Sequence, residues 1–447
     1  MLNILSAYLK KRNKRKIWSS LKGYRIIKKE NRLDLLIKLK KEISETQIKS
    51  YPNKLLYNGS KNELNISIKQ FLLTRLLHID FNTKILISIT KKNKNLYQPL
   101  PLEWRKVLEK NGFKANTLIN KLIWNAYLIM FFTYGTLSNL MRIFNSLKHI
   151  CLFSITLDLN KSAYFYNLSY NNVVLRKDSE NIISWADKYF REKDLNFLFH
   201  NVKNIKTFKL NKKQVKYIQN IIPLPNTFYS LIKFINWGFY SFILSIFDFL
   251  RGRYFSFIMY NELSMSYLVD IAKNNQIPKK IFFHQVGYLF KPLWTNSLEK
   301  RESIAYLYFY ATGIKSPDFK NSNGVQGHFF NLMTWRNYLV WDLYQKEFIE
   351  NITLYDSIID VTGPIYFSTG LTPKINYKKS IALFDIQPLR DSFTKRLGNE
   401  TEYYESNTAI KFLNDILDIA DKYEFKVYHK RKRDISKYQI NGFSLNN

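Results

Sequence analysis

The spacing of apolar and polar residues in the first part of the chain predicts mainly helices. Three short apolar runs, 84–90, 151–157 and 162–168, are the exceptions and predict strands. Residues 228–275 are helical in pattern, with a break at Arg251-Gly252-Arg253. The other stretches with helical periodicity are 62–79, 119–149 and 179–190.

From about residue 280 onward, short apolar runs alternate with helical segments. The runs predict strands at 280–286, 304–310 and 357–362, and the segments between them predict helices at 295–301 and 334–351. Short strands separated by helices indicate a parallel sheet that is covered on both faces. The pattern therefore predicts an α/β fold.

A strand, a helix and a second strand follow a Gly- and Pro-containing linker at 369–379. The first strand is expected at 380–386, the helix at about 407–423 and the second strand at 425–428. Ligands of parallel α/β sheets bind outside the carboxyl ends of the strands. Both strand ends carry polar or basic residues, namely Asp385, Arg390, His429, Lys430, Lys432 and Arg433.

These strand-end residues suit a phosphate-bearing ligand, because Arg offers a fork of donors and Lys a compact charge. The alternative is that the Lys-Arg run is a solvated turn. The length of 447 residues predicts more than one domain. We expect a basic segment at 1–50, an α/β domain at 51–370 and a second α/β domain at 371–447. Few residues follow Arg433, so the second domain is expected to be incomplete.

The net charge of +34 predicts attraction to polyanions such as nucleic acid, anionic lipid or phosphorylated substrates. An overall bias toward Lys, Asn and Ile is the competing explanation. Residues 1–41 exceed that bias, with fourteen Lys or Arg and only two acidic residues beside apolar side chains and Trp18. Such a segment is typical of a helix on an anionic membrane surface, and a solvated helix is the alternative.

Two uncharged stretches bear on membrane contact. Residues 122–141 match the length of a spanning helix but include several polar side chains, and 234–247 is too short to span. Both are interpreted as packed or membrane-touching helices. Cys151 is the only cysteine, which favours a reducing compartment. We therefore expect a cytoplasmic protein that is peripheral at the inner face of the membrane.

The sequence lacks dinucleotide, P-loop and nucleophile-elbow motifs, and its six histidines show no metal-ligand spacing. No metal is expected. His284, within a predicted strand, is a candidate catalytic base, although a core histidine is the alternative. Glu262 interrupts an uncharged segment and is a second candidate for deprotonating an acceptor hydroxyl, with a solvent-facing Glu as the alternative. Trp294, Tyr306, Tyr308, Tyr310 and Trp341 are aromatic candidates for stacking on sugars, or core residues.

An ordered set of short motifs then resembles bacterial surface-polysaccharide biosynthesis proteins that are similar to GT-B glycosyltransferases. The resemblance covers about residues 228–437. It is carried by Lys291-Pro292-Leu293-Trp294-Thr295, Tyr308-Phe309-Tyr310-Ala311-Thr312-Gly313, Tyr338-Leu339-Val340-Trp341-Asp342, Gly363-Pro364-Ile365-Tyr366-Phe367, Phe384-Asp385-Ile386-Gln387-Pro388-Leu389-Arg390 and Lys430-Arg431-Lys432-Arg433.

The resemblance implies a GT-B-like fold with two Rossmann-like domains, the N-terminal one rich in helices. It implies an acceptor in the N-terminal domain, either a glycan or a lipid-linked glycan. A nucleotide-sugar donor would bind in the C-terminal domain as a co-substrate, without a further cofactor, and His429-Lys430 would lie near its phosphates. Relatives continue beyond the Lys-Arg run, so the resemblance also implies truncation.

Two other classes of protein remain open. A nucleic-acid-binding protein would use the positive charge, but no zinc finger, RNA-recognition motif or helix-turn-helix supports it. An inactive scaffold that keeps the fold without the activity is the other alternative.

Overall fold

The structure, a computed structural model, divides the chain into two compact units that each combine distant segments. The first unit comprises Met1–Thr46, Arg75–Trp124 and Pro373–Asn447, and the second comprises Gln47–Thr74 and Asn125–Thr372. The residues it describes are 2–32, 34–57, 59–76, 79–151, 158–166, 182–190, 196–199, 208–210, 213–217, 221–284, 290–309, 332–353, 356–365, 379–384 and 406–430.

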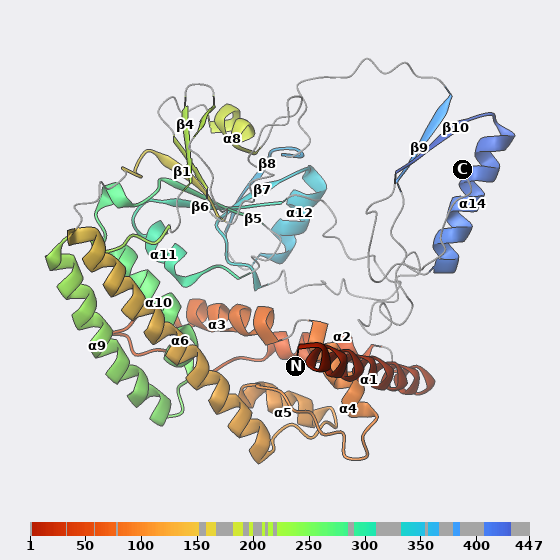
Figure 1. The fold of residues 1–447 in the computed structure, drawn as a ribbon, viewed down its shortest axis with the longest axis horizontal. Coiled ribbons are helices and arrows are strands. Elements are labelled where there is room, and N and C mark those ends of the chain that lie inside the picture. The colour runs from red at the N-terminus through yellow and green to blue at the C-terminus, as the bar shows by residue number, and fades with distance from the viewer. Residues whose placement is uncertain are drawn as a thin grey trace. The chain divides into compact units, whose positions relative to one another are not determined.

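The N-terminal part of the first unit is helical (Figure 1). It contains α1 (Leu2–Lys29), α2 (Leu35–Glu45), α4 (Ile79–Ile89), α5 (Leu102–Lys110) and the start of α6 (Leu118–Cys151). Helix α1 packs against α4 so closely that a Cβ atom added to Gly23 would lie 1.9 Å from the carbonyl oxygen of Leu86. Only a glycine allows the two backbones to approach this far.

The strand predicted at 84–90 is wrong, because this run belongs to α4. Phe81, Ile85 and Leu86 are fully buried, and Phe81 and Ile85, four residues apart, lie on the same helical face. A short uncharged run fits a buried helix as well as a buried strand. Packing against α1 decides between them.

The C-terminal part of the first unit confirms the predicted order of strand, helix and strand. Strands β9 (Ser380–Phe384) and β10 (Lys426–Lys430) pair in parallel, and α14 (Ser406–Lys422) connects them in sequence. Register alignment sets His429 opposite Leu383 and Lys430 opposite Phe384. Both strands therefore end at the same edge of the pair.

The second unit is built on a mostly parallel sheet (Figure 1). Within the described residues its strand order is β3-β4-β2-β1-β5-β6-β7-β8, and only the β3–β4 pair is antiparallel. The strands are β1 (Ser162–Tyr166), β2 (Asn196–Phe199), β3 (Phe208–Leu210), β4 (Lys213–Tyr217), β5 (Lys280–His284), β6 (Ile304–Tyr308), β7 (Asn337–Val340) and β8 (Ile358–Val361).

The central strands are apolar on both faces because the sheet is covered on both sides. Ile281, Phe282 and Phe283 are consecutive in β5 and are all fully buried. Helices of this unit include most of α3 (Lys61–Leu76), α8 (Ile182–Phe190), α11 (Leu293–Glu299) and α12 (Leu343–Ile352). The protein is thus a mixed α/β protein with a largely parallel sheet and many helices, as the pattern predicts.

The helix predicted at 334–351 starts too early. Residues 337–340 form β7, and α12 begins only at Leu343. The Asp342 carboxylate accepts a hydrogen bond from the backbone N–H of Gln345 at 2.7 Å and caps the helix there. The polar cap, which the periodicity does not reveal, separates strand from helix.

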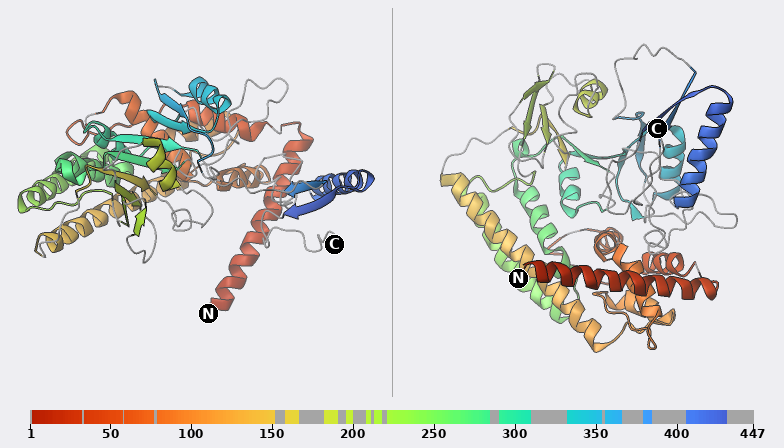
Figure 2. Two further views of the ribbon diagram at one scale, coloured as in Figure 1. Left: turned by 90° about the horizontal axis from the view of Figure 1, so that it is seen from above. Right: turned by 45° about the vertical axis from the view of Figure 1, so that its right-hand side comes forward.

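Three long helices of the second unit run side by side, as the views in Figures 1 and 2 agree. They are α6 from Asn125 onward, α9 (Phe228–Leu250) and α10 (Phe255–Ile271). The ring of Phe132 on α6 stacks on Phe242 of α9 at 5.1 Å and on Phe257 of α10 at 4.2 Å. The predicted break at 251–253 is confirmed as the turn between α9 and α10.

Candidate functional site

The order of the strands reverses at β1. From β1 the chain passes through α8 to β2 on one side, whereas β5, β6, β7 and β8 extend the sheet on the other side. Open parallel sheets bind ligands outside the carboxyl ends of the strands at such a reversal. At this point β1 ends at Tyr166 and β5 ends at His284.

His284 lies half-buried at this edge, beside Tyr308 of β6. The centroids of the two rings are 5.0 Å apart. Burial lowers the pKa of the His284 imidazole to about 4, so the ring is neutral at neutral pH. A neutral imidazole can accept a proton, although a pKa this low makes it a weak base. The structure places this candidate at the kind of sheet edge where open parallel sheets bind ligands, and its catalytic role stays a prediction.

Glu262 lies on α10 and contacts the beginning of α11. Its Oε2 atom accepts a hydrogen bond from the backbone N–H of Leu293 at 3.0 Å. Burial lowers the pKa of the Arg142 guanidinium, and the charge of Glu262 opposes this shift. Glu262 therefore helps to hold α11 in position, and its suggested role in deprotonating an acceptor stays a prediction.

A buried ion pair, which the sequence did not reveal, fixes the chain between β5 and α11. The Nζ atom of Lys291 lies 2.6 Å from Oε2 of Glu299, and the two side chains are 4% and 13% exposed. The backbone N–H of Lys291 donates to the side chain of Gln70 on α3 at 3.3 Å. Gln70 in turn donates to the carbonyl of Leu332. One amide side chain thus ties two chain segments that border the sheet.

The predicted donor-binding residues are only partly described. His429 and Lys430 are the last two residues of β10, and the structure describes them by backbone alone. Asp385, Arg390, Lys432 and Arg433 lie outside the described residues. The carboxyl end of β10 is therefore placed beside that of β9, while phosphate binding there stays a prediction.

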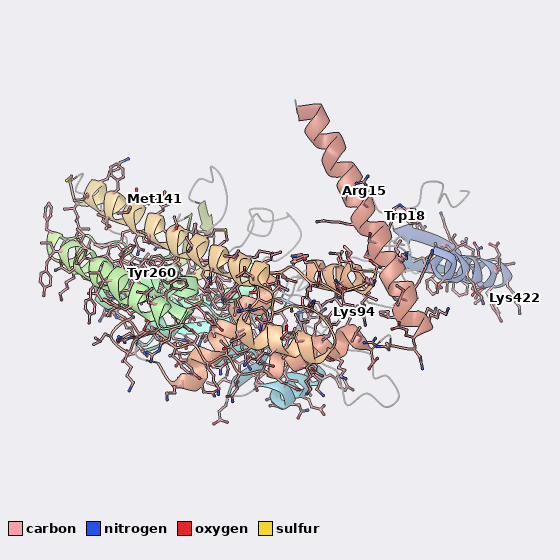
Figure 3. All side chains as sticks on the ribbon, turned by 90° about the horizontal axis from the view of Figure 1, so that it is seen from below. Arg15, Trp18, Lys94, Met141, Tyr260 and Lys422 are labelled. Carbon is pink, nitrogen blue, oxygen red and sulfur yellow. The ribbon has the colours of Figure 1, made fainter. Side chains whose placement is uncertain are left out.

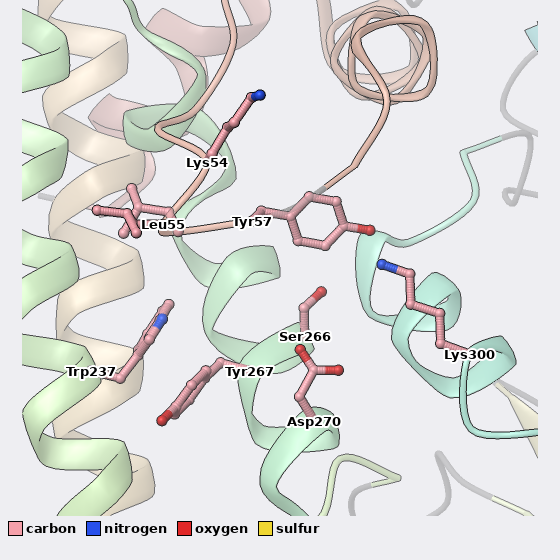
Figure 4. A pocket seen from close by; sticks show the side chains of 9 residues that line it. Lys54, Leu55, Tyr57, Trp237, Ser266, Tyr267, Asp270 and Lys300 are labelled. Carbon is pink, nitrogen blue, oxygen red and sulfur yellow. The ribbon is translucent and has the colours of Figure 1, made fainter.

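A cavity of about 240 Å³ opens in the second unit, between α9, α10, α11 and the segment before α3 (Figure 4). Trp237 and Tyr267 stack on each other with ring centroids 5.0 Å apart and form one side of it. The Nζ atom of Lys300 lies 5.4 Å from the ring centroid of Tyr57 on the opposite side. Its lining residues are Lys54, Leu55, Leu56, Tyr57, Trp237, Ser266, Tyr267, Asp270 and Lys300.

Polar groups between these two sides face the cavity. Figure 4 shows Ser266 and Asp270 between Trp237 and Lys300. The Oγ atom of Ser266 and the Nε1 atom of Trp237 are buried and have no hydrogen-bond partner among the described residues. Burial raises the pKa of the Asp270 carboxyl, which Ser297, Lys300 and Arg301 oppose. Buried polar atoms are normally satisfied, so these groups suit a polar ligand.

The aromatic residues singled out in the sequence do not line this cavity. Trp294, Tyr306 and Tyr308 are buried in the sheet core, which confirms the alternative interpretation for them. Trp341 is half-buried and donates its ring N–H to the carbonyl of Phe309 at 2.8 Å, and Tyr310 lies outside the described residues. Within the part of the chain that is described, no three His, Cys, Asp or Glu side chains gather to hold a metal ion.

The fold and the cavity define a mixed α/β protein with an aromatic and polar cavity of the size of a small ligand. Residues 230–444, just under half of the chain, match the family model described as polysaccharide biosynthesis PFTS motif protein. The match begins in α9 and includes β5 to β10. It supports a role in polysaccharide biosynthesis. No curated protein and no solved structure gave a significant match.

Proposed function

We propose that this protein is a glycosyltransferase-like enzyme of polysaccharide biosynthesis. It transfers a sugar from a nucleotide-sugar to a glycan or lipid-linked acceptor. The second unit binds the acceptor, and β9, α14 and β10 of the first unit contribute to donor binding, as expected of a GT-B-like fold. The reaction takes place at the cytoplasmic face of the membrane.

The observation that carries the proposal is the cavity beside α10. Sugar rings have apolar faces that pack on aromatic side chains, and hydroxyl groups that need hydrogen-bond partners. The stacked pair Trp237–Tyr267 offers the first kind of contact, and Ser266 and Asp270 offer the second. The cavity volume of about 240 Å³ is slightly below that of sites for drug-sized ligands, roughly 300–1,000 Å³. It therefore suits one or two sugar units of an acceptor.

Donor binding is supported by the carboxyl end of β10. His429 and Lys430 end this strand, and Lys432 and Arg433 follow it in sequence. A diphosphate is stabilised by such cationic donors without a metal ion. His284 lies at the strand reversal of the second unit and outside the lining of the cavity beside α10; we propose it as the base for an acceptor hydroxyl that extends from the cavity to the carboxyl end of β5.

The test measures transfer and donor binding separately. Radiolabelled nucleotide-sugars are incubated with the full chain and an extract of lipid-linked glycans, and label in the lipid fraction is counted. Calorimetric titration with uridine, guanosine and thymidine diphosphates measures donor binding. We expect Lys430→Ala and Arg433→Ala each to weaken binding roughly tenfold, since a charge-assisted hydrogen bond is worth about 1.5–3 kcal/mol.

Lys426→Ala is the matched control, because Lys426 begins the same strand at its opposite end and is exposed. It should bind nucleotide like the unaltered protein. Ser266→Ala should lower transfer without changing nucleotide binding. Failure of every nucleotide to bind would refute the donor assignment, and normal transfer by Ser266→Ala would refute the acceptor site.

A further inference from the structure

The last part of α9 has its polar side chains buried and its apolar side chains exposed. From Gly238 onward, the buried positions are Ser241, Ser245 and Asp248. The outward positions are Phe239, Tyr240, Phe242, Ile243, Ile246, Phe247 and Leu250, which are 36–74% exposed. A helix on a water-facing surface has the opposite arrangement. The outward row of α9 is therefore built for an apolar environment.

The last part of α6 repeats this inversion. Its buried positions from Gly135 onward are Gly135, Asn139 and Ser146. The outward positions are Tyr134, Leu137, Leu140, Met141, Phe144 and Leu147, which are 39–69% exposed. Figure 3 labels Met141 of α6 and Tyr260 of α10. Because α6 shows the same inverted pattern, the exposed apolar row of α9 is not a chance property of one helix.

Several inward polar groups of both helices form hydrogen bonds with α10, which lies behind them. Arg142 of α6 donates to Asn261 at 2.8 Å and to Ser264 at 3.2 Å. Ser241 of α9 and Tyr260 of α10 form a hydrogen bond of 2.9 Å. Because both helices turn their polar stripes toward α10, their apolar rows face away from it. Together these rows form one outer face, which we call the α6/α9 face.

Charge is distributed around this face with one sign. Helix α6 contains no acidic residue, and the single acidic residue of α9, Asp248, is 2% exposed. The Asp248 carboxylate accepts hydrogen bonds from Asn53 at 3.0 Å and Ser256 at 3.2 Å, so it faces inward. Exposed cationic residues lie on or at the ends of the two helices, namely Lys148, Lys233 and Arg251, and Arg253 forms an ion pair with Asp248 at 3.8 Å.

We propose that the α6/α9 face lies on an anionic lipid bilayer. The outward rows enter the boundary between head groups and acyl chains, and the cations contact the lipid phosphates. A monomer in water rarely exposes an apolar surface of this extent. In a symmetric dimer through this face, the same cationic residues would oppose each other, which disfavours a second copy. The bilayer supplies both the apolar environment and the opposite charge.

A surface position fits α9 better than a spanning one. Among the described helices, α9 alone is long and apolar enough to cross a membrane, and 28% of its most apolar window is buried inside the protein. Its buried side contacts α10 from Trp237 to Phe249, and Lys233 and Asn236 are exposed within its first half. A helix that crossed the bilayer would leave these polar groups in hydrocarbon. The contact also lies on different elements from the basic segment at 1–41.

The chain has a single cysteine, Cys151, so replacing it allows one labelling site to be introduced at a chosen position. In a Cys151→Ser background, Phe239→Cys is labelled with an environment-sensitive nitrobenzoxadiazole dye and mixed with vesicles of phosphatidylglycerol and phosphatidylcholine in equal parts. We expect a severalfold rise in emission and a shift to shorter wavelength. Leu343→Cys on α12 is the matched control, because Leu343 is 71% exposed, as is Phe239. Its label should not respond.

Charge substitutions give the second measurement. Phe239→Asp and Phe144→Asp should each weaken co-sedimentation with the vesicles by roughly tenfold or more, whereas Leu343→Asp should have no effect. Circular dichroism shows whether each variant folds. An unresponsive label at residue 239 would overturn the proposal. Retention of the protein in vesicles after alkaline carbonate washing would overturn it as well, because it indicates a spanning helix. So would a finding that the unaltered protein does not bind vesicles and forms a dimer that Phe239→Asp dissociates.

Discussion

Removing Glu299 is expected to destabilise the second unit strongly, because it leaves Lys291 as a buried charge without its partner. The Lys291 side chain is only 4% exposed, so solvent screens it little. Breaking a buried ion pair from one side costs about 3–5 kcal/mol. We expect Glu299→Gln to lower the free energy of unfolding by this amount, and the melting temperature by on the order of 10 °C.

The pH dependence of this variant follows from the direction of the pKa shift. Burial lowers the pKa of Lys291 below its ordinary 10.5, and Glu299 opposes the shift. Without Glu299 the pKa falls further. Between the folded-state pKa and 10.5 the unfolded chain binds more protons than the folded one, so stability rises with pH in that window. The Glu299→Gln variant should therefore regain stability as the pH approaches 10.5.

Urea unfolding followed by circular dichroism measures these energies, and the double variant Lys291→Met/Glu299→Gln completes the cycle. The double variant should be more stable than Glu299→Gln alone, because it no longer buries a charge. A loss below about 1 kcal/mol for Glu299→Gln would refute the reasoning, since it is the magnitude of a solvent-exposed pair. A double variant as unstable as Glu299→Gln would refute it too.

Three further predictions follow from single side chains. The pKa of His284 is about 4, against an ordinary 6.5, so the unfolded chain takes up the proton at a higher pH than the folded chain. Stability should therefore fall as the pH falls from 6.5 to about 4. His284→Gln should flatten this part of a melting-temperature profile. Trp237→Phe removes a buried N–H that has no hydrogen-bond partner among the described residues, but it also replaces the indole by a smaller ring; the two effects oppose each other, so urea unfolding should show a loss of only about 1 kcal/mol. Gly23→Ala should lower the free energy of unfolding in urea by about 1–3 kcal/mol, since its Cβ would lie 1.9 Å from the carbonyl oxygen of Leu86. Gly238→Ala in α9 is the control. Nothing lies within 4 Å of its added Cβ, so the free energy of unfolding should not fall.

The strands and helices of the α/β part are largely predictable from the sequence. The strand predicted at 304–310 is observed at Ile304–Tyr308, and the long helical zone at 228–275 is observed as α9 and α10. These segments have strong periodicity or clear boundaries such as Gly252. The run at 84–90 was assigned wrongly because its structure is decided by packing against α1, which local spacing does not contain.

The candidate site was predictable only in part. A histidine within an apolar strand is visible in the sequence and makes His284 a candidate, whereas its position as the last residue of β5 is visible only in the structure. The cavity was not found, because its lining residues come from segments more than 200 residues apart, such as Lys54 and Lys300. Trp237 looked like one more apolar residue of α9. The spacing of Tyr267 and Asp270 on one helix face was the only local sign.

The pairing of β1 with β5 has a practical consequence for protein production. The segment that matches the family model starts at residue 230, after β1, β2 and β4. Produced alone, it would keep β5 to β8 but leave Lys280–His284 as an unpaired edge with an apolar strand behind it. Unprotected edges of this kind pair with other chains and aggregate. The segment that matches the family model is therefore not expected to fold as a soluble fragment by itself, and such a fragment has to begin before Ser162.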